Sequence, residues 1–405
     1  MFKKLKLFGD LEVTKDLKLL LLLGGLYSLS VALSNTFVNI YLWKQSGNFA
    51  TLSLYNLSIV ILQPLTFILA GRWAKKVDRV IVLRIGVIFL ALFYLAVLAA
   101  GTGASKFLFL LGGLLGIGYG FYWLAFNVLT FEITEPETRD FFNGFLGILS
   151  SAGGMVGPLA SGFIITRVVN FNGYMIVFGL SLALFSLAVF LSFFLKPRPS
   201  SGKYSVGDVF KERGRNRNWK LVTNAHFFQG LREGTFVFVI SVYVFLSTGS
   251  ELSLGTFGLI NSGVSFLAYY FASRLIKKQR RKKAILLGGL ILFASVFLLV
   301  YQVNFQKMLL YGSVIAIAYP ILLVPYMSIT YDVIGRSRNA AEMRIEYIVV
   351  REVFLNIGRI VSILVFLAGI TLFDWQESIP ILLVILGAGH ACIYFFLRKV
   401  HLSSP

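Results

Sequence analysis

Cysteine and histidine are nearly absent from this chain of 405 residues. Cys392 is its one cysteine, which excludes an intramolecular disulfide, and three histidines are too few for a histidine metal cluster. Acidic residues are scarce as well, with 18 Asp and Glu against 38 Lys and Arg. A nucleic-acid-binding protein would need a polar surface to carry this basic excess, yet charged residues make up only 14% of the chain. We expect no metal, no cofactor and no nucleic-acid partner.

Apolar residues fill the space that charge leaves: they form 57% of the chain, and the mean hydropathy is +0.80. A soluble globule of this size could not bury so much apolar surface, because single cores stop growing at roughly 250–300 residues. A helix needs about 20 apolar residues to cross a membrane. Such runs predict an all-α integral membrane protein with about twelve spans, at 17–42, 49–71, 80–100, 107–131, 141–166, 173–195, 220–247, 254–276, 284–301, 308–333, 345–372 and 379–397.

Basic residues are unevenly divided between the loops. Nearly all those outside the spans lie in the termini and in the loops that follow even-numbered spans, whereas the other loops hold only Lys44, Lys106, Arg167 and Lys307. Because basic loops stay on the cytoplasmic side, we expect a multi-pass plasma-membrane protein with both termini in the cytoplasm. Orientation of the spans, with some contact to anionic membrane lipids, is a sufficient role for this charge.

The two halves of the chain repeat each other. A shift of about 202 residues lays the basic segment 70–86 on 272–289 and Gly47 on Gly249. Two parallel repeats of six helices are typical of transporters that bind their substrate between the halves. We expect three parts, an N-terminal six-helix bundle, a basic cytoplasmic linker and a C-terminal six-helix bundle, at 1–195, 196–219 and 220–405.

This organisation resembles the major facilitator superfamily, and strings such as HFFQGLREG are similar to its YqgE-type permeases of Gram-positive bacteria. GRWAKKVDRVIVL after span 2 resembles the family's loop signature, with Gly71 and Arg79 in place. Lys75 stands where the family has Asp, and Asp78 stands where it has Gly. The resemblance implies that this loop belongs to a gate between the halves and that the gate is altered here. We expect Arg79 to pair with Asp78 or with Glu132 instead.

GGMVGPLASG in span 5 resembles a signature of the family's proton-driven antiporters, with Gly153, Gly157, Pro158 and Gly162 in place. Small residues let helices approach closely and a proline lets them bend, so we expect Gly157 and Pro158 to serve packing and bending between the halves. A packing face without a coupling role is the alternative. Gly112 stands about where the family carries an arginine tied to proton coupling, which argues against drug–proton antiport by the usual route.

Ionisable residues inside the spans stand out, because each costs at least about 2.5–3.5 kcal/mol to insert and marks a functional site by default. Span 7 carries Arg232 and Glu233, and span 11 carries Arg351, Glu352 and Arg359. Three arginines against two glutamates leave one cation unmatched, and a guanidinium binds carboxylate or phosphate through two parallel hydrogen bonds. We predict a buried network that binds an anionic substrate group, with Glu233 and Glu352 as candidates for proton coupling.

Helical spacing supports this network. Glu352, Asn356 and Arg359 recur at i, i+4 and i+7, which places all three on one face of span 11, and we count Asn356 among the substrate-binding candidates. The alternative is a set of ion pairs, Arg232–Glu352 or Glu233–Arg359, that only hold helices together. Buried ion pairs are weak evidence for stability, because desolvation offsets their attraction.

Aromatic and amide side chains take the place of charge in the N-terminal half. They suit the apolar body of an amphipathic substrate, although a single aromatic is more often core packing. The candidates for the cavity wall are Asn35, Asn39, Tyr119, Trp123, Asn127 and, in span 10, Tyr326. Pro320 and Pro325 flank Tyr326 and should kink span 10 as a gate requires. His390 is expected at the periphery.

The sequence contains no GxxxxGK[ST] phosphate-binding loop, which excludes ATP as an energy source by that motif, and no nucleophile triad that suggests an enzyme. We expect a monomeric secondary transporter that moves a small or amphipathic, anionic molecule by alternating access, with proton coupling left open. A flippase for lipids or lipid-linked substrates would have the same fold. A non-transporting membrane scaffold or sensor is the alternative from another class.

Overall fold

Among the residues that the structure describes, twelve helical stretches are long and apolar enough to cross a membrane, as the hydropathy predicts. The computed structural model describes residues 14–133, 136–168, 171–198 and 203–401; the basic residues that precede Thr14 and the first residues of the loop at 134–145 lie outside this part. The N-terminal helices are α1 (Lys15–Ser46), α2 (Phe49–Ala74), α3 (Arg79–Ala100), α4 (Leu108–Ile133), α5 (Pro136–Arg167) and α6 (Asn172–Ser192).

The C-terminal helices follow in the same order of spans. They are α8 (Arg217–Leu246), α9 (Glu251–Leu275), α10 (Arg281–Val296), α11 (Phe305–Gly335), α12 (Arg344–Leu372), α13 (Trp375–Gly387) and α14 (Gly389–Leu397). Short 3-10 turns occupy Gly101–Lys106, Lys278–Arg280 and Phe297–Leu299. The last span therefore consists of two helices, α13 and α14, which are divided at Ala388. Pro320 and Pro325 are buried inside α11, which continues through both.

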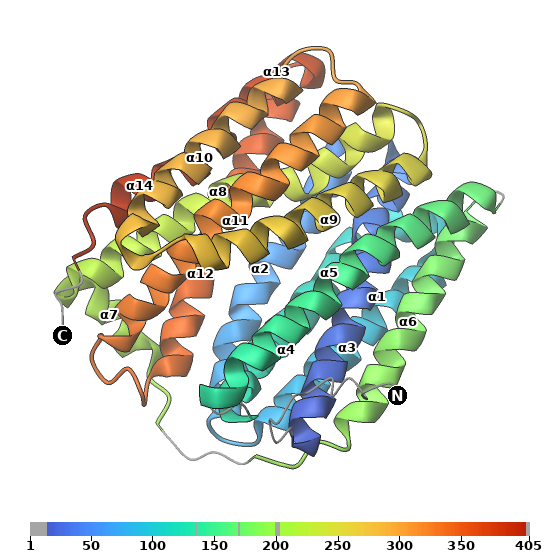
Figure 1. The fold of residues 1–405 in the computed structure, drawn as a ribbon. Coiled ribbons are helices and arrows are strands. Elements are labelled where there is room, and N and C mark those ends of the chain that lie inside the picture. The colour runs from blue at the N-terminus through green and yellow to red at the C-terminus, as the bar shows by residue number, and fades with distance from the viewer. Residues whose placement is uncertain (1–13, 134–135, 169–170, 199–202, 402–405) are drawn as a thin grey trace, which may run out of the picture.

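Two pseudo-symmetric bundles of six spans lie side by side, blue to green and yellow to red in Figure 1. Their contacts follow the repeat: α2 and α3 both pack on α4, and α9 and α10 both pack on α11. The halves meet chiefly along two helix pairs, α2 with α12 and α5 with α9, and α1 also contacts α8. The turns repeat too, since Gly47 and Gly249 both have a left-handed backbone, with φ of +60° and +68°, a region where glycine meets no steric penalty.

A helix occupies part of the segment predicted as a loop between the bundles. Helix α7 (Val206–Arg215) buries Val209 against the C-terminal half, where the Trp219 indole donates a hydrogen bond of 3.2 Å to the Val209 carbonyl. The Arg213 guanidinium lies over the Phe354 ring and donates to the hydroxyl of Thr223. The linker is thus partly folded onto α8 and α12, because one face of α7 carries apolar residues that pack against them.

The glycines of α5 divide between two partners. A Cβ atom at Gly157 would lie 2.9 Å from Ala32 of α1, and Gly153 also faces α1. The expectation that Gly157 packs between the halves is therefore wrong, because α1 and α5 belong to the same half. Gly162 and Pro158 face the backbone of α9 across the interface; a Cβ atom at Gly162 would lie 2.6 Å from a carbonyl oxygen of α9.

Candidate substrate-binding cavity

A central cavity of about 770 Å³ lies between the halves, a size typical of small-molecule sites. Helices α1, α2 and α4 supply its N-terminal wall, and α8, α9, α11 and α12 supply its C-terminal wall. Ten of the predicted residues line it: Asn35, Asn39, Tyr119, Trp123, Asn127, Arg232, Glu233, Arg351, Glu352 and Arg359.

Three residues lie elsewhere than expected. Tyr326 is completely buried behind the wall, with its ring 4.8 Å from the His226 ring. Asn356 is also completely buried, and its amide donates to the Glu352 backbone carbonyl at 2.9 Å. Helical spacing predicted the correct face of α12, but the side chain lies behind the cavity wall and does not line the cavity. His390 is fully buried, 5.7 Å between ring centres from the cavity residue Tyr319, and is not peripheral.

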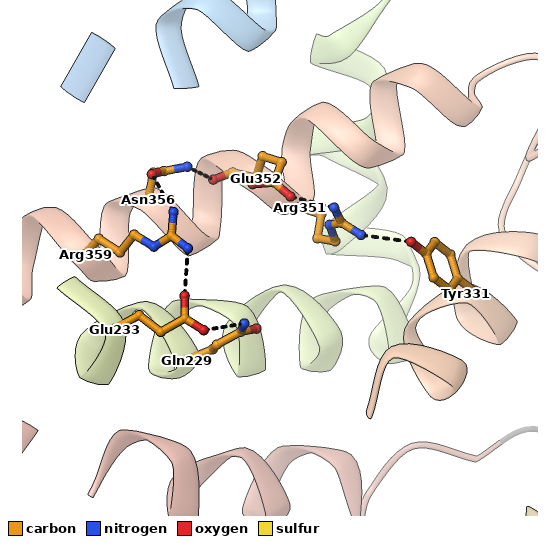
Figure 2. A network of polar contacts seen from close by, with 7 residues as sticks. All are labelled: Gln229, Glu233, Tyr331, Arg351, Glu352, Asn356 and Arg359. Carbon is orange, nitrogen blue, oxygen red and sulfur yellow. Dashed lines mark hydrogen bonds and ion pairs between the residues drawn. The ribbon is translucent and has the colours of Figure 1, made fainter. Parts of the chain in front are cut away.

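Glu233 joins three helices of the C-terminal half. One of its carboxylate oxygens forms a 2.7 Å ion pair with Arg359 of α12, as Figure 2 shows. The other oxygen accepts hydrogen bonds from Gln229 at 2.8 Å and from the Tyr319 hydroxyl of α11 at 3.0 Å. Glu233–Arg359 is thus one of the two ion pairs that the sequence suggested. Because both of its oxygens are engaged, this carboxylate fixes the geometry of the wall.

The second pair in the wall is local. Arg351 forms an ion pair with its neighbour Glu352 at 2.5 Å and points a second nitrogen at the Tyr331 hydroxyl, 3.4 Å away (Figure 2). Glu352 is therefore engaged by Arg351, so the suggested pair with Arg232 does not form.

Arg232 is the cation left over. Its guanidinium donates to the Tyr311 hydroxyl at 3.2 Å and lies 4.6 Å from the centre of the Phe236 ring. Among the described residues no carboxylate forms an ion pair with it, and its buried Nε has no hydrogen-bond partner. The side chain lines the cavity although the residue is only 6% exposed. It can give two-point hydrogen bonds to an anionic group at little further desolvation.

The N-terminal wall is aromatic and carries amides. The Trp123 indole donates to the Tyr27 hydroxyl at 2.9 Å, and the Tyr27 ring stacks on Tyr122 at 4.1 Å. The Tyr119 hydroxyl donates to the Asn35 side chain at 3.3 Å. These contacts hold flat ring faces and amide groups at fixed positions, an arrangement that suits the stacking of an apolar or aromatic substrate body.

An ion pair joins the halves on the face that carries the linker, which we call the linker face. Lys75, at the end of α2, forms a salt bridge with Glu346 of α12 and also donates to the Glu342 carbonyl at 3.0 Å. The backbone N–H of Ser205 donates to the same Glu346 carboxylate at 3.2 Å. Glu346 is completely buried. The lysine that departs from the family pattern thus bridges the halves on the linker face.

The residues of the same loop that were predicted to form a gate make their contacts in the N-terminal half and with the linker. Arg79 pairs with Glu132 at 2.8 Å, the second of the two predicted options. Burial raises the pKa of the Glu132 carboxyl, and the nearby Arg79 opposes that shift. Asp78 instead caps α3, accepting a 2.6 Å hydrogen bond from Val80. Gly71 faces the linker, where a Cβ atom would lie 2.7 Å from the Tyr204 hydroxyl.

A second ion pair joins the halves on the opposite face, and the sequence did not single it out. Lys44 of α1 forms a 2.8 Å salt bridge with Glu251 of α9, whose carboxylate also accepts from the Tyr174 hydroxyl of α6 at 2.8 Å. Lys44 was visible only as one of the few basic residues in the poorly charged loops. The pair joins residues 207 positions apart, a separation that no local pattern reveals.

Comparison with known proteins agrees with this architecture. The chain is 64% identical over 400 residues to protein YqgE of Bacillus subtilis (strain 168), which covers 99% of this chain and 93% of that one. It is 56% identical over 206 residues to a protein encoded in the sodM 3' region of Geobacillus stearothermophilus, covering 51% of this chain and 96% of that one.

Two solved structures share the fold at low sequence identity. The human organic anion transporter MFSD10 (TETRAN) aligns with a TM-score of 0.66 and 15% identity, over 94% of this chain and 98% of that one. A point mutant of the nucleoside transporter NupG aligns with a TM-score of 0.72 and 14% identity, over 94% and 99%. Residues 20–345 match the Major Facilitator Superfamily. The chain is a multi-pass membrane transporter that belongs to the Major Facilitator Superfamily.

Proposed function

We propose that this transporter carries a small organic anion with an apolar or aromatic body through the central cavity, and that Arg232 binds its anionic group. The observation that carries the proposal is the charge balance of the wall. Glu233 and Glu352 engage Arg359 and Arg351, which leaves the Arg232 guanidinium without a carboxylate among the described residues. A cation held in an enclosed, apolar setting is stabilised by an anion that replaces the missing partner.

The rest of the substrate is matched by the opposite wall. Trp123, Tyr27 and Tyr119 present ring faces, and Asn35 and Asn39 add hydrogen-bonding groups. An aromatic or flat apolar body stacks on such rings with a gain of about 0.5–1.5 kcal/mol beyond its buried area. We infer that the anionic group contacts the C-terminal wall while the body contacts the N-terminal wall, so that one molecule touches both halves at once.

We infer that access alternates between the two faces by rocking of the segments 1–195 and 220–405 about this cavity, with 196–219 as the linker. The Lys75–Glu346 pair would open on the linker face and the Lys44–Glu251 pair on the opposite face. From the basic loops we infer that the linker face and both termini lie in the cytoplasm and that the protein resides in the plasma membrane. A single chain holds the whole cavity, which supports a monomer as the working unit.

For proton coupling we propose Glu352 rather than Glu233. Glu233 has both carboxylate oxygens engaged, so its protonation would dismantle the wall. Glu352 lines the cavity and is held through one oxygen by Arg351. A Glu352→Gln variant should still exchange substrate across the membrane but should lose acceleration by an imposed pH gradient.

The test is transport of a panel of labelled organic anions, and of neutral and cationic analogues with the same body, by the purified protein in proteoliposomes. Wild-type protein should prefer the anions. Arg232→Gln should lower the affinity for them by roughly 10- to 100-fold, the loss expected when a hydrogen bond to a charged group is removed. It should leave uptake of neutral analogues nearly unchanged.

Arg232→Lys is the matched variant, because lysine keeps the charge but loses the planar fork. It should fall between wild type and Arg232→Gln. Equal uptake of anions by wild type and Arg232→Gln would contradict the proposal. Movement of a fluorescent lipid between leaflets, with no uptake of soluble anions, would instead assign the protein as a flippase.

A further inference from the structure

A second hollow lies on the outer surface of the C-terminal half. It has a volume of about 850 Å³, and its walls are α9 and α10, with Ile317 and Ile321 of α11 as its floor. It forms because α9 and α10 both pack on α11 but hardly touch each other. We call this hollow the α9–α10 groove.

The groove is apolar along its length and basic at one end. Leu267, Phe271 and Leu275 of α9 line one wall and are more than half exposed. Arg280 and Lys283 lie at the rim on the linker face. The ion pairs of the described residues do not include either cation, whereas the adjacent Arg281 is paired with Asp332 at 2.8 Å.

The dimensions match one leaflet of a bilayer. The lining runs along α9 from Val264 to Leu275, which is about 16 Å at 1.5 Å per residue. That length is roughly half of the 30 Å hydrocarbon core. An acyl chain lying in the groove would therefore reach from mid-membrane to the rim, where its headgroup would meet the two cations.

The corresponding surface of the N-terminal half lacks these features. The repeat places Asp78 where Arg280 stands and Ile81 where Lys283 stands, and Asp78 is used to cap α3. In the most apolar stretch of α2, 67% of the residues are buried, against 11% in the repeat-related helix α9. The groove and its cations are therefore a property of one half, and the helix pattern common to both halves does not require them.

We propose that the α9–α10 groove binds an anionic phospholipid from the leaflet at the linker face, with its headgroup phosphate held by Arg280 and Lys283. Basic residues at the membrane surface attract anionic lipids by about 1 kcal/mol each, and the apolar walls select a lipid over a soluble phosphate. This site is separate from the central cavity and does not depend on the identity of the transported substrate.

The test uses the full-length protein in nanodiscs of phosphatidylcholine that contain a small fraction of phosphatidylglycerol with a photoreactive acyl chain. After irradiation, adducts are mapped by peptide mass spectrometry. They should concentrate in the peptides of α9 and α10 that line the groove. A phosphatidylcholine probe with the same acyl chain should label these peptides at least about fivefold less, because it carries no net charge for the two cations.

Two double variants separate a site from general attraction. Arg280→Gln with Lys283→Gln should lower labelling roughly fivefold or more. Lys277→Gln with Lys278→Gln removes the same charge from the same turn, outside the groove lining, and should leave labelling unchanged. Ala284→Phe, which fills the groove and keeps the rim charges, should also lower it.

Several outcomes would overturn the proposal. Equal loss in both double variants would mean bulk electrostatics, and labelling spread evenly over all lipid-facing helices would mean unspecific surrounding lipid. A cross-linked pair of chains through α9 and α10 would assign the groove to a second copy. Competition in the wild-type protein gives an independent check, since unlabelled phosphatidylglycerol, but not phosphatidylcholine, should displace the probe.

Discussion

The two walls of the central cavity are built from opposite kinds of side chain. The N-terminal wall carries rings and amides, while the C-terminal wall carries five ionisable residues within α8 and α12. The repeat gives the two halves one backbone plan, so the difference lies in the side chains alone. A pseudo-symmetric scaffold can thus present two chemistries to one ligand, and each wall can be changed without altering the other.

The largest expected effect comes from the ion pair that organises the charged wall. Glu233→Leu leaves Arg359, whose side chain is only 24% exposed, without its carboxylate partner, and the loss of one member of a buried pair costs up to about 3–5 kcal/mol. We expect a clearly lower thermal unfolding temperature in detergent. Glu233→Leu combined with Arg359→Leu should recover most of it, because the pair is then replaced by apolar groups.

Transport assays on the same variants separate a structural role of this pair from a role in substrate binding. If the double variant is stable but does not transport, Arg359 has a second role: it contacts the substrate in addition to pairing with Glu233. If the single variant unfolds at the wild-type temperature, the pair contributes nothing to the wall, and the comparison between the walls loses its structural basis.

A smaller effect is expected on the aromatic wall. Trp123→Leu keeps an apolar side chain but removes the ring and its hydrogen bond to Tyr27, so KM for substrates with an aromatic body should rise roughly three- to tenfold. Trp123→Phe should have less effect. The selectivity for anions over neutral analogues should not change in either variant; a change in charge preference would show that the walls do not divide recognition.

The smallest effect concerns a single hydroxyl. Tyr119→Phe removes a 3.3 Å hydrogen bond to Asn35 and keeps the ring, so transport affinity should fall by no more than about tenfold, in line with about 0.5–1.5 kcal/mol for one neutral hydrogen bond. Substrate titration in proteoliposomes measures this change. A loss as large as that of Arg232→Gln would mean that Asn35 or Tyr119 carries the recognition assigned to the charged wall.

The sequence could identify cavity residues of a type that is rare inside spans, but not those of a type that is common there. Charged residues inside spans are few, so Arg232, Glu233 and Arg359 could be picked out directly. Tyr311 and Tyr319 line the cavity as well and could not be picked out, because the chain holds 18 tyrosines and a tyrosine in a wall looks like one in the core. Tyr326 is the opposite error: it was predicted to line the cavity wall, but it is completely buried.

Contacts between residues far apart in the chain were the other feature that the sequence could not predict. Hydropathy predicts all twelve spans because each needs only its own composition. The Lys75–Glu346 bridge joins residues 271 positions apart, and periodicity carries no information on such a distance. The same holds for Gly157, whose small size predicts close packing but not which helix fills the space.

Two consecutive linker residues hold opposite halves of the protein. The Tyr204 hydroxyl donates to the Ile68 carbonyl of α2 at 2.9 Å, and the Ser205 N–H donates to Glu346 of α12. Neighbouring Cα atoms are only about 3.8 Å apart, so the linker face cannot open while both bonds persist. Arg198 is bound to Asp78 of the N-terminal half, and the chain from Arg198 to Ser205 can extend to roughly 23–25 Å. The segment from Arg198 to Ser205 therefore acts as a tether. Its length limits how far the two halves can separate before α7 must detach from α8 and α12.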